Sequence, residues 1–211
     1  TDDGSLAWTP AGIAAGSYKV QVSSTADANA KDASDAVFSI IISPLDLTFG
    51  TNGTVTTSLG AGTDTRGLAV IELPDGKLVV AGRSVTSTYG SPEFALVQYN
   101  ADGSLDHSFG TNGSALTLIG KDLDIGWEVA RKADGKIVVA GQTETGPGDD
   151  NFAILRFSPS GTLDTTFGPG NDGRVSTDLS GGQDDRAYDV IVQPDGKLLV
   201  SGTSHDGSNI A

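Results

Sequence analysis

Cysteine is absent from this chain of 211 residues, and so is methionine. Without cysteine there can be no disulfide bond, thiol nucleophile or cysteine-based zinc site. The two histidines, His107 and His205, belong to no nucleophile or metal-binding motif. No apolar run approaches the ~20 residues of a membrane-spanning helix. The sequence therefore predicts a protein that does not insert into a membrane, and its histidines give no indication of catalysis.

Basic residues are scarce: Lys and Arg number 13 against 27 Asp and Glu, which gives a formal charge of −14. Such a chain repels the phosphate backbone of nucleic acids, so a nucleic-acid partner is not expected. Two interpretations of the acidic excess stay open. One is solubility and resistance to association. The other is binding of divalent cations, which prefer oxygen ligands.

Apolar residues are also few, at 37 % against the ~45–50 % of typical globular chains, a range that includes glycine. The 29 glycines account for much of the difference, and this density favours many tight turns between short strands. The chain opens at TDDGS without an initiator methionine or a signal peptide. We therefore expect a piece of a longer protein.

What the sequence does contain is a repeat. LDLTFGTNG, LDHSFGTNG and LDTTFGPGNDG begin at residues 45, 105 and 163, at intervals of 60 and 58 residues. A second signature follows in each copy: PDGKLVVAG from Pro74, ADGKIVVAG from Ala133 and PDGKLLVSG from Pro194. A fixed period of this length indicates one supersecondary unit that is used repeatedly.

Each repeat has four candidate strands, which in the first copy are Thr54–Leu59, Leu68–Leu73, Leu78–Arg83 and Phe94–Tyr99. The Asp-Gly turn predicts a hairpin between the second and third. The third strand is almost wholly apolar, which is typical of a strand covered on both faces. Its central residues should therefore be buried: Val79, Val138 and Leu199.

Four strands per unit predict the blades of a β-propeller, which typically has about four to eight blades. Three repeats are too few to close such a ring, and the third copy stops at Ala211, where its fourth strand should begin. We therefore expect an all-β, open fragment of a larger propeller. Further blades or another chain would be needed to close it.

The first 43 residues differ from the rest, with strands predicted over Tyr18–Val22 and Val37–Ile42. The segments DGSLAWTP, AAGSYKVQVSS and DASDAVFSI resemble the last strands of an Ig-like domain in Ser/Thr-rich cell-wall proteins and bacterial surface proteins. A complete sandwich needs ~100 residues, so only its C-terminal part is expected. The predicted domains are a partial Ig-like sandwich, 1–43, and a repeat region, 44–211, with units 45–104, 105–162 and 163–211.

The repeat region resembles the delta-60 repeat family of bacterial secreted and surface proteins. The resemblance is carried by LDxTFGxxG and PDGKxVVAG, about 60 residues apart, with FALxRYNxDGSLD between them. It implies a propeller-like fold and an extracellular or cell-surface location in bacteria. The sequence departs from the pattern at Ala133, where the other copies have proline, and at an insertion around Pro169–Asn171.

Acidic residues recur just before the second strand of each repeat. Those in equivalent places are Asp64, Asp124, Asp184 and Asp185, and they form the candidate metal site, with calcium as the ion. No segment has the ligand spacing of an EF-hand loop, so solvated turns are the alternative. The Asp-Gly-Lys turns are interpreted as hairpins whose Asp caps its own backbone. The repeated Phe49, Phe109 and Phe167 are interpreted as packing between blades rather than as a ligand-stacking ladder.

These observations favour a non-enzymatic structural or binding module of a larger extracellular or cell-surface protein, with adhesion among its roles. Protein or glycan surface ligands would be its partners, recognised by loops on a rigid β scaffold. The alternative is a fragment of a propeller enzyme, a lyase or glycosidase, whose active site lies mostly outside this chain. No catalytic residue and no organic cofactor are predicted.

Overall fold

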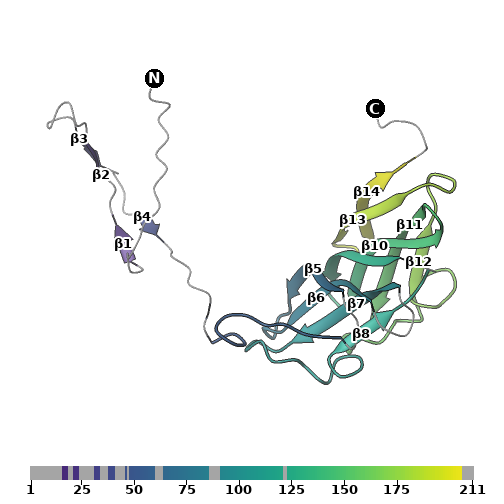
Figure 1. The fold of residues 1–211 in the computed structure, drawn as a ribbon, viewed down its shortest axis with the longest axis horizontal. Helices are drawn as coiled ribbons and strands as arrows, with labels where there is room; N and C mark the ends of the chain where they lie inside the picture. Colours follow the sequence, from purple (N-terminus) through teal and green to yellow (C-terminus); the bar gives the residue numbers. More distant parts are fainter. Residues whose placement is uncertain are drawn as a thin grey trace.

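The computed structural model describes residues 46, 48–59, 64–85, 91–120 and 123–205, and the backbone of four short strands before them (Figure 1). These are β1 (Gly16–Tyr18), β2 (Gln21–Ser23), β3 (Lys31–Ala33) and β4 (Phe38–Ile40). β1 pairs with β4 and β2 with β3, both antiparallel. The Ig-like resemblance of this region stays a prediction.

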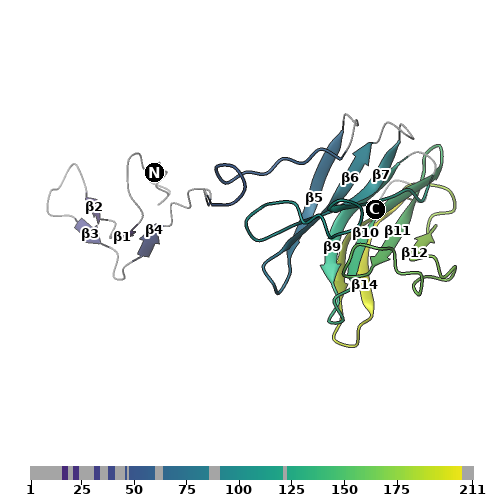
Figure 2. The same ribbon diagram turned by 90° about the horizontal axis from the view of Figure 1, so that it is seen from below.

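The repeat region is all-β and antiparallel (Figures 1 and 2). The first sheet has the order β5 (Thr65–Glu72), β6 (Leu78–Val85), β7 (Pro92–Tyr99) and β8 (Ser114–Thr117). The second is β9 (Asp124–Arg131), β10 (Ile137–Gly146), β11 (Asp149–Phe157) and β12 (Arg174–Thr177). The third has two strands, β13 (Asp185–Val192) and β14 (Leu198–Ser204). The predicted open set of four-stranded blades is thereby confirmed. The described part of the chain holds no helix capable of spanning a membrane.

The assignment of the first strand is wrong in one respect. In the first repeat, Thr54–Leu59 forms no strand, and only Thr54 makes an isolated bridge, with Thr51. The corresponding segments of the next two repeats are β8 and β12, and each completes the sheet of the preceding repeat. Each four-stranded sheet is therefore built by two consecutive sequence repeats. The unit of folding is offset from the unit of sequence.

The Asp-Gly hairpins form as predicted. Gly76, Gly135 and Gly196 have φ of 79°, 86° and 82°, a region that glycine enters without the penalty that Cβ imposes. In each turn the Asp side chain accepts a hydrogen bond from the backbone N–H of the lysine two residues later, at 3.3, 3.2 and 3.0 Å. This local bond is the self-capping expected of Asp in a turn.

The sheets stack face to face. We call the side of a sheet that is turned toward the next sheet its leading face, and the opposite side its trailing face. The leading face of the first sheet carries Val79, Ala81, Phe94 and Leu96, and it packs on the trailing face of the second, which carries Val129, Ile137, Val139 and Leu155. In a second cluster, Val138, Ala140 and Ile154 pack against Ala187 and Val190 of the third sheet. Burial of these apolar surfaces is the main force that holds the stack together.

Two of the three predicted core residues are confirmed, because Val79 and Val138 are fully buried. The prediction for Leu199 is wrong, since this side chain is 55 % exposed. Leu199 lies on the leading face of the third sheet, and no further sheet covers that face in the described part of the chain. Phe109 is buried in the cluster between the first two sheets, and Phe167 packs against the cluster between the second and third, as the packing interpretation expects.

Candidate binding site

The acidic residues predicted to bind calcium are each engaged by protein groups. Asp64 accepts hydrogen bonds from Arg66 Nε at 2.8 Å and Arg83 Nη2 at 2.5 Å. The bond from Arg66, together with the charges of both arginines, lowers the pKa of the Asp64 carboxyl. Asp184 similarly accepts from Arg186 Nη2 at 2.7 Å. Both carboxylates therefore have a cationic side chain as their partner.

Asp124 and Asp185 occupy equivalent positions at the start of β9 and β13, and both are fully buried. Asp124 accepts from the backbone N–H of Ile119 at 2.5 Å, and Asp185 from that of Leu179 at 2.6 Å. Each carboxylate thus ties the preceding loop to its strand. Burial raises the pKa of Asp124. At Asp185 burial acts in the same direction, but the hydrogen bonds from Ser204 and from the loop backbone outweigh it and lower the pKa.

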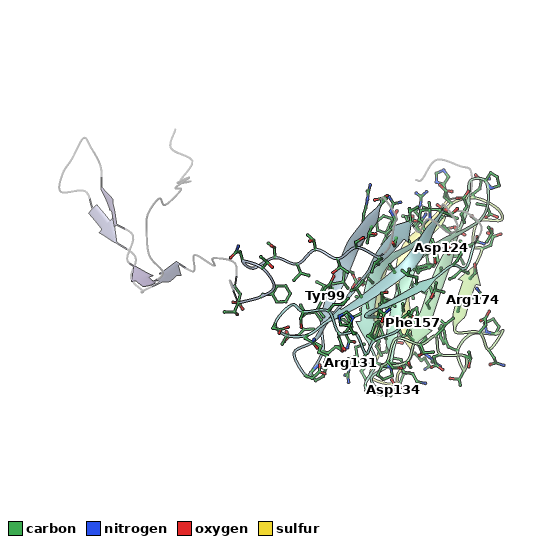
Figure 3. The ribbon with its side chains drawn as sticks, turned by 60° about the horizontal axis from the view of Figure 1, so that its bottom comes forward. Tyr99, Asp124, Arg131, Asp134, Phe157 and Arg174 are labelled. Carbon is green, nitrogen blue, oxygen red and sulfur yellow. The ribbon has the colours of Figure 1, made fainter. Side chains whose placement is uncertain are left out.

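These four residues come from the entries to three successive sheets. Within the ranges that the structure describes, no group of three or more His, Cys, Asp or Glu side chains is arranged to hold a metal ion. Figure 3 shows Asp124 and Asp134 at opposite ends of the second sheet, so the acidic loops lie far from the Asp-Gly turns. Calcium binding at the acidic loops stays a prediction.

A second set of carboxylates connects the two repeated signatures. Asp106, from the LDxTFG motif, lies 2.7 Å from the Nζ of Lys77 in the preceding Asp-Gly-Lys turn. Asp164 lies 2.9 Å from Lys136 in the same way. Hydrogen bonds from the lysine and from the hydroxyl two residues later hold the pKa of both carboxyls well below the usual range. These acids therefore have a structural role, because each connects an Asp-Gly-Lys turn to the motif that follows it.

One edge of every sheet carries the same irregularity. The pairing of β5 with β6 shifts register between Gly67 and Ala69, so that Leu68 has no partner. The equivalent shifts leave Trp127 unpaired in β9 and Tyr188 unpaired in β13. A β-bulge of this kind bends the strand and redirects a side chain, and bulges are frequent beside functional sites.

The bulges explain the glycine that ends the VVAG signature. A Cβ atom at Gly82, Gly141 or Gly202 would overlap the carbonyl oxygen of the residue just before the bulge on the paired strand. Because β9 contacts both β5 and β13, the three bulged strands lie next to one another. The unpaired side chains Leu68, Trp127 and Tyr188 therefore follow one shared edge of the stack.

Trp127 and Tyr188 meet at the junction of the second and third sheets. Their ring centroids are 5.8 Å apart and their planes are inclined at 65°. Trp127 Nε1 donates to Gln142 Oε1 at 2.8 Å, and Gln142 Nε2 donates to Asp150 Oδ2 at 2.6 Å. Arg186 Nη2 then links Asp150, at 3.0 Å, to Asp184. We call these six residues the aromatic corner.

Sequence reasoning did not find the aromatic corner. A signal was present: Leu68, Trp127 and Tyr188 all stand eight positions before the glycine of the Asp-Gly turn. A bulky apolar residue at one fixed position of every repeat indicates a shared structural task. The register shift that turns this position into a bulge is visible only in the pairing of the strands.

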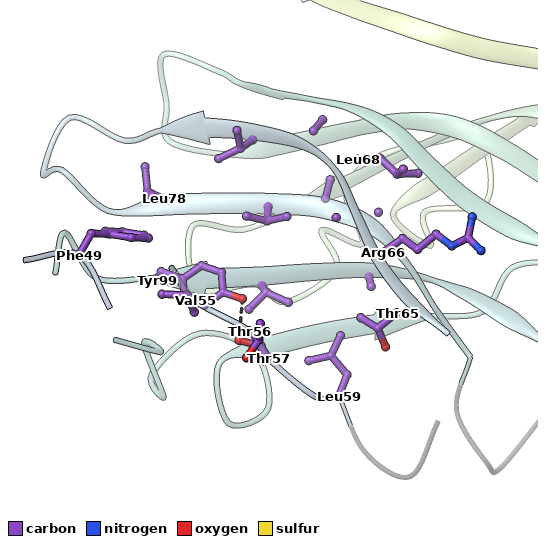
Figure 4. A pocket seen from close by; sticks show the side chains of 18 residues that line it. Phe49, Val55, Thr56, Thr57, Leu59, Thr65, Arg66, Leu68, Leu78 and Tyr99 are labelled. Atoms are coloured by element: carbon purple, nitrogen blue, oxygen red, sulfur yellow. Dashed lines mark hydrogen bonds between the residues drawn. The ribbon is translucent and has the colours of Figure 1, made fainter. Parts of the chain in front are cut away.

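A groove with a volume of ≈ 610 Å³ lies on the trailing face of the first sheet (Figure 4). It is lined by Phe49, Val55 and Leu59 of the segment before β5 and by the sheet residues Leu68, Val70 and Tyr99. Tyr99 Oη is bonded to Thr57 Oγ1 at 2.7 Å. Val70 is 59 % exposed here. Its counterparts Val129 and Val190 are 2 % and 4 % exposed, because a sheet covers each of them.

A family model described as a domain of unknown function (DUF5122) beta-propeller matches residues 73–109 and 132–167. Each matched segment runs from the Asp-Gly turn, through two strands, to the phenylalanine of the next LDxTFG motif or its counterpart. The match supports a β-propeller repeat family. No curated protein matches the chain.

Proposed function

We propose that this chain is a non-enzymatic structural and binding module of a larger extracellular or cell-surface protein, in which like sheets continue the stack at both ends. The observation that carries this proposal is the repeated interface: the leading face of one sheet packs on the trailing face of the next, twice in succession. A module that stacks in this way offers the same surfaces to further sheets. The extracellular setting and the adhesive role rest on the resemblance to delta-60 repeats.

Both end faces have the composition of an interface. On the trailing face of the first sheet, Leu68 and Val70 are exposed, and Val80 lines the same groove. On the third sheet, Ile191 and Leu199 are more than half exposed. Large contiguous apolar patches on soluble proteins mark surfaces that contact another molecule. The two internal interfaces indicate which partner fits these end faces, because the equivalent valines are buried there by another sheet of the same kind.

The first repeat also contains a segment that corresponds to a strand but has no sheet to join. Residues 54–57 correspond to β8 and β12, which complete the sheet of the repeat before them. In the structure they lie instead beside the open trailing face of the first sheet. We infer that this segment completes the outer edge of a further sheet, which covers that face. Such a sheet comes from further blades or from another chain.

The carboxylates support a scaffold rather than a catalyst. Among the described residues, four of the five buried acids, Asp106, Asp124, Asp150 and Asp185, each accept hydrogen bonds from backbone or side-chain donors that fix the sheets. A general acid or base must instead face a space that a substrate can enter. These buried acids therefore have a structural role and not that of a general acid or base.

The proposal is tested by the association state of the 1–211 chain and of two variants, Val70→Asp and Leu199→Asp. We expect the parent chain to self-associate with increasing concentration in sedimentation velocity and to bind a hydrophobic dye. Each variant should reduce both effects and keep the melting temperature, because an exposed charge disrupts only the open face. A parent chain that stays monomeric at all concentrations and binds no dye would contradict the proposal.

A further inference from the structure

We propose that the aromatic corner binds a positively charged side chain, lysine or arginine, of a partner protein. This inference deepens the proposed binding function, and it rests on that function because the corner lies at a junction of two stacked sheets. The ligand class follows from three features of the corner: the inclination of its two rings, the hydrogen bonds that fix one of them, and the charge around them.

The rings form two walls that are not parallel. Trp127 and Tyr188 are inclined at 65° with centroids 5.8 Å apart, and Tyr188 is 43 % exposed. The face of an aromatic ring carries partial negative charge, and a cation within ≈ 6 Å of the ring centroid is attracted to it. Tryptophan is the strongest of the three aromatic partners in such contacts. In this edge-to-face pair, a cation can approach the ring faces that the contact between the two rings leaves open.

The tryptophan is held in place before any ligand binds. Its Nε1–H is bonded to Gln142, and Gln142 is bonded in turn to Asp150. Gln142 and Asp150 are both buried, so solvent does not compete for these bonds. A ring that is already fixed loses little conformational entropy when a ligand binds.

The charges around the rings select a cation. Glu128 follows Trp127 directly, while Asp150 and Asp184 are bonded to Arg186. The two carboxylates against one guanidinium leave this cluster negative, and Glu128 adds an acidic residue next in the sequence, on a chain of net charge −14. A neutral sugar would need free polar groups beside the ring, but Gln142 and Asp150 are buried, and the exposed Asp184 and Arg186 are paired with each other. Charge complementarity therefore favours a cationic side chain over a glycan.

The equivalent place in the first sheet lacks this chemistry. Leu68 stands where the later sheets have Trp127 and Tyr188, and Arg66 and Arg83 are paired with Asp64 beside it. Two positive side chains and no ring would repel a cation. The inference therefore applies to the junction of the second and third sheets, and not to every repeat.

The test uses the full 1–211 chain and isothermal titration calorimetry with tetramethylammonium chloride as the probe. Neopentyl alcohol, a neutral molecule of similar shape, is the matched control, and the peptide Gly-Gly-Lys-Gly-Gly amide is compared with its norleucine counterpart. We expect saturable binding of the ammonium ion and of the lysine peptide, and weaker binding of both at higher salt. The inference would be overturned if neopentyl alcohol and the norleucine peptide bound as tightly as the charged probes. It would also be overturned if a neutral sugar bound and the charged probes did not.

Variants locate the binding. Tyr188→Leu should weaken binding of the probe at least about tenfold, because one wall is lost, while Tyr188→Phe keeps the ring and should bind nearly as the parent. Tyr99→Phe, on the trailing face of the first sheet, is the control and should change nothing. If folded Tyr188→Leu binds as the parent does, the inference is wrong. Neither Val70 nor Leu199 belongs to the corner, so failure of this test is separable from failure of the stacking proposal.

Discussion

The ammonium group of Lys77 lies 2.7 Å from Oδ2 of Asp106, a residue of the following sequence repeat. Lys136 and Asp164 repeat this relationship one sheet later, at 2.9 Å. Each pair joins an Asp-Gly-Lys turn to the LDxTFG motif that follows it along the chain. The two signatures are thus connected through their charged side chains, and the bond fastens the start of one repeat to the sheet of the one before.

Replacement of Asp106 by Asn should lower stability at neutral pH. The pKa of the Asp106 carboxyl is lowered in the folded protein, first by the bond from Lys77. A carboxyl with a lowered folded pKa adds stability above its unfolded pKa of about 3.9, and this contribution is lost as the pH falls further. The difference between parent and Asp106→Asn should therefore be full at pH 7 and shrink below about pH 4. Urea unfolding from pH 7 to pH 2 measures it.

Asp195→Asn is the matched control, since Asp195 pairs with Lys197 where both side chains are exposed. Pairs in solvent contribute little, so this variant should unfold with the parent. A constant difference between parent and Asp106→Asn across the whole pH range would show that the ion pair is not its source.

Gly141→Ala should destabilise the second sheet. A Cβ atom at this position would overlap the carbonyl oxygen of Ile125 beside the bulge. A backbone carbonyl in a sheet cannot move aside as the end of a flexible side chain can. We therefore expect a loss of about 3 kcal/mol in the free energy of unfolding. Gly146→Ala is the control, because nothing lies within 4 Å of a Cβ built there. Equal stability of the two variants in urea unfolding would contradict the assigned register.

Val138→Asp should unfold its sheet, whereas Leu199→Asp should be tolerated. These residues stand at equivalent places in the second repeated signature, yet Val138 is fully buried and Leu199 is 55 % exposed. A charge without a partner in a dry core costs several kcal/mol, roughly the full stability of a small domain. Thermal unfolding by circular dichroism distinguishes the two. Similar melting temperatures for both variants would show that the leading faces are not covered as described.

Calcium should raise the melting temperature if the acidic loops bind it. Binding to the folded state alone stabilises that state in proportion to the logarithm of the ligand concentration. The measurement is thermal unfolding in EDTA and in millimolar calcium, for the parent and for a variant with Asp184 and Asp185 changed to Asn. The variant should lose the shift. No shift in the parent would eliminate the calcium site, and an unchanged shift in the variant would move it elsewhere.

The local parts of the fold could be predicted from the sequence. The Asp-Gly turns specify their own hairpins, because Gly76 adopts positive φ and Asp75 caps the turn within two residues. The strands on either side follow from their apolar pattern. These features depend on neighbours in the chain, and sequence reasoning is at its best there.

The features that the sequence concealed all depend on distant pairing. The alternation of Ser114–Thr117 fits an outer strand of either the preceding or its own repeat, and only the sheet decides between them. The burial of Leu199 depends on whether another sheet lies against it. Trp127 became part of a candidate site because of a register shift between two strands, which no apolar pattern specifies.

The offset between repeat and sheet has a mechanical consequence. Pulling on the C-terminal end of the chain cannot unfold the third repeat independently, because its first strand, β12, is the outer strand of the second sheet. Stripping that strand breaks the ladder with β11 before the force reaches anything further upstream. The chain itself thereby connects neighbouring sheets, because one repeat contributes strands to two of them. Under tension such an array should yield in coupled steps, each of which spans two sequence repeats.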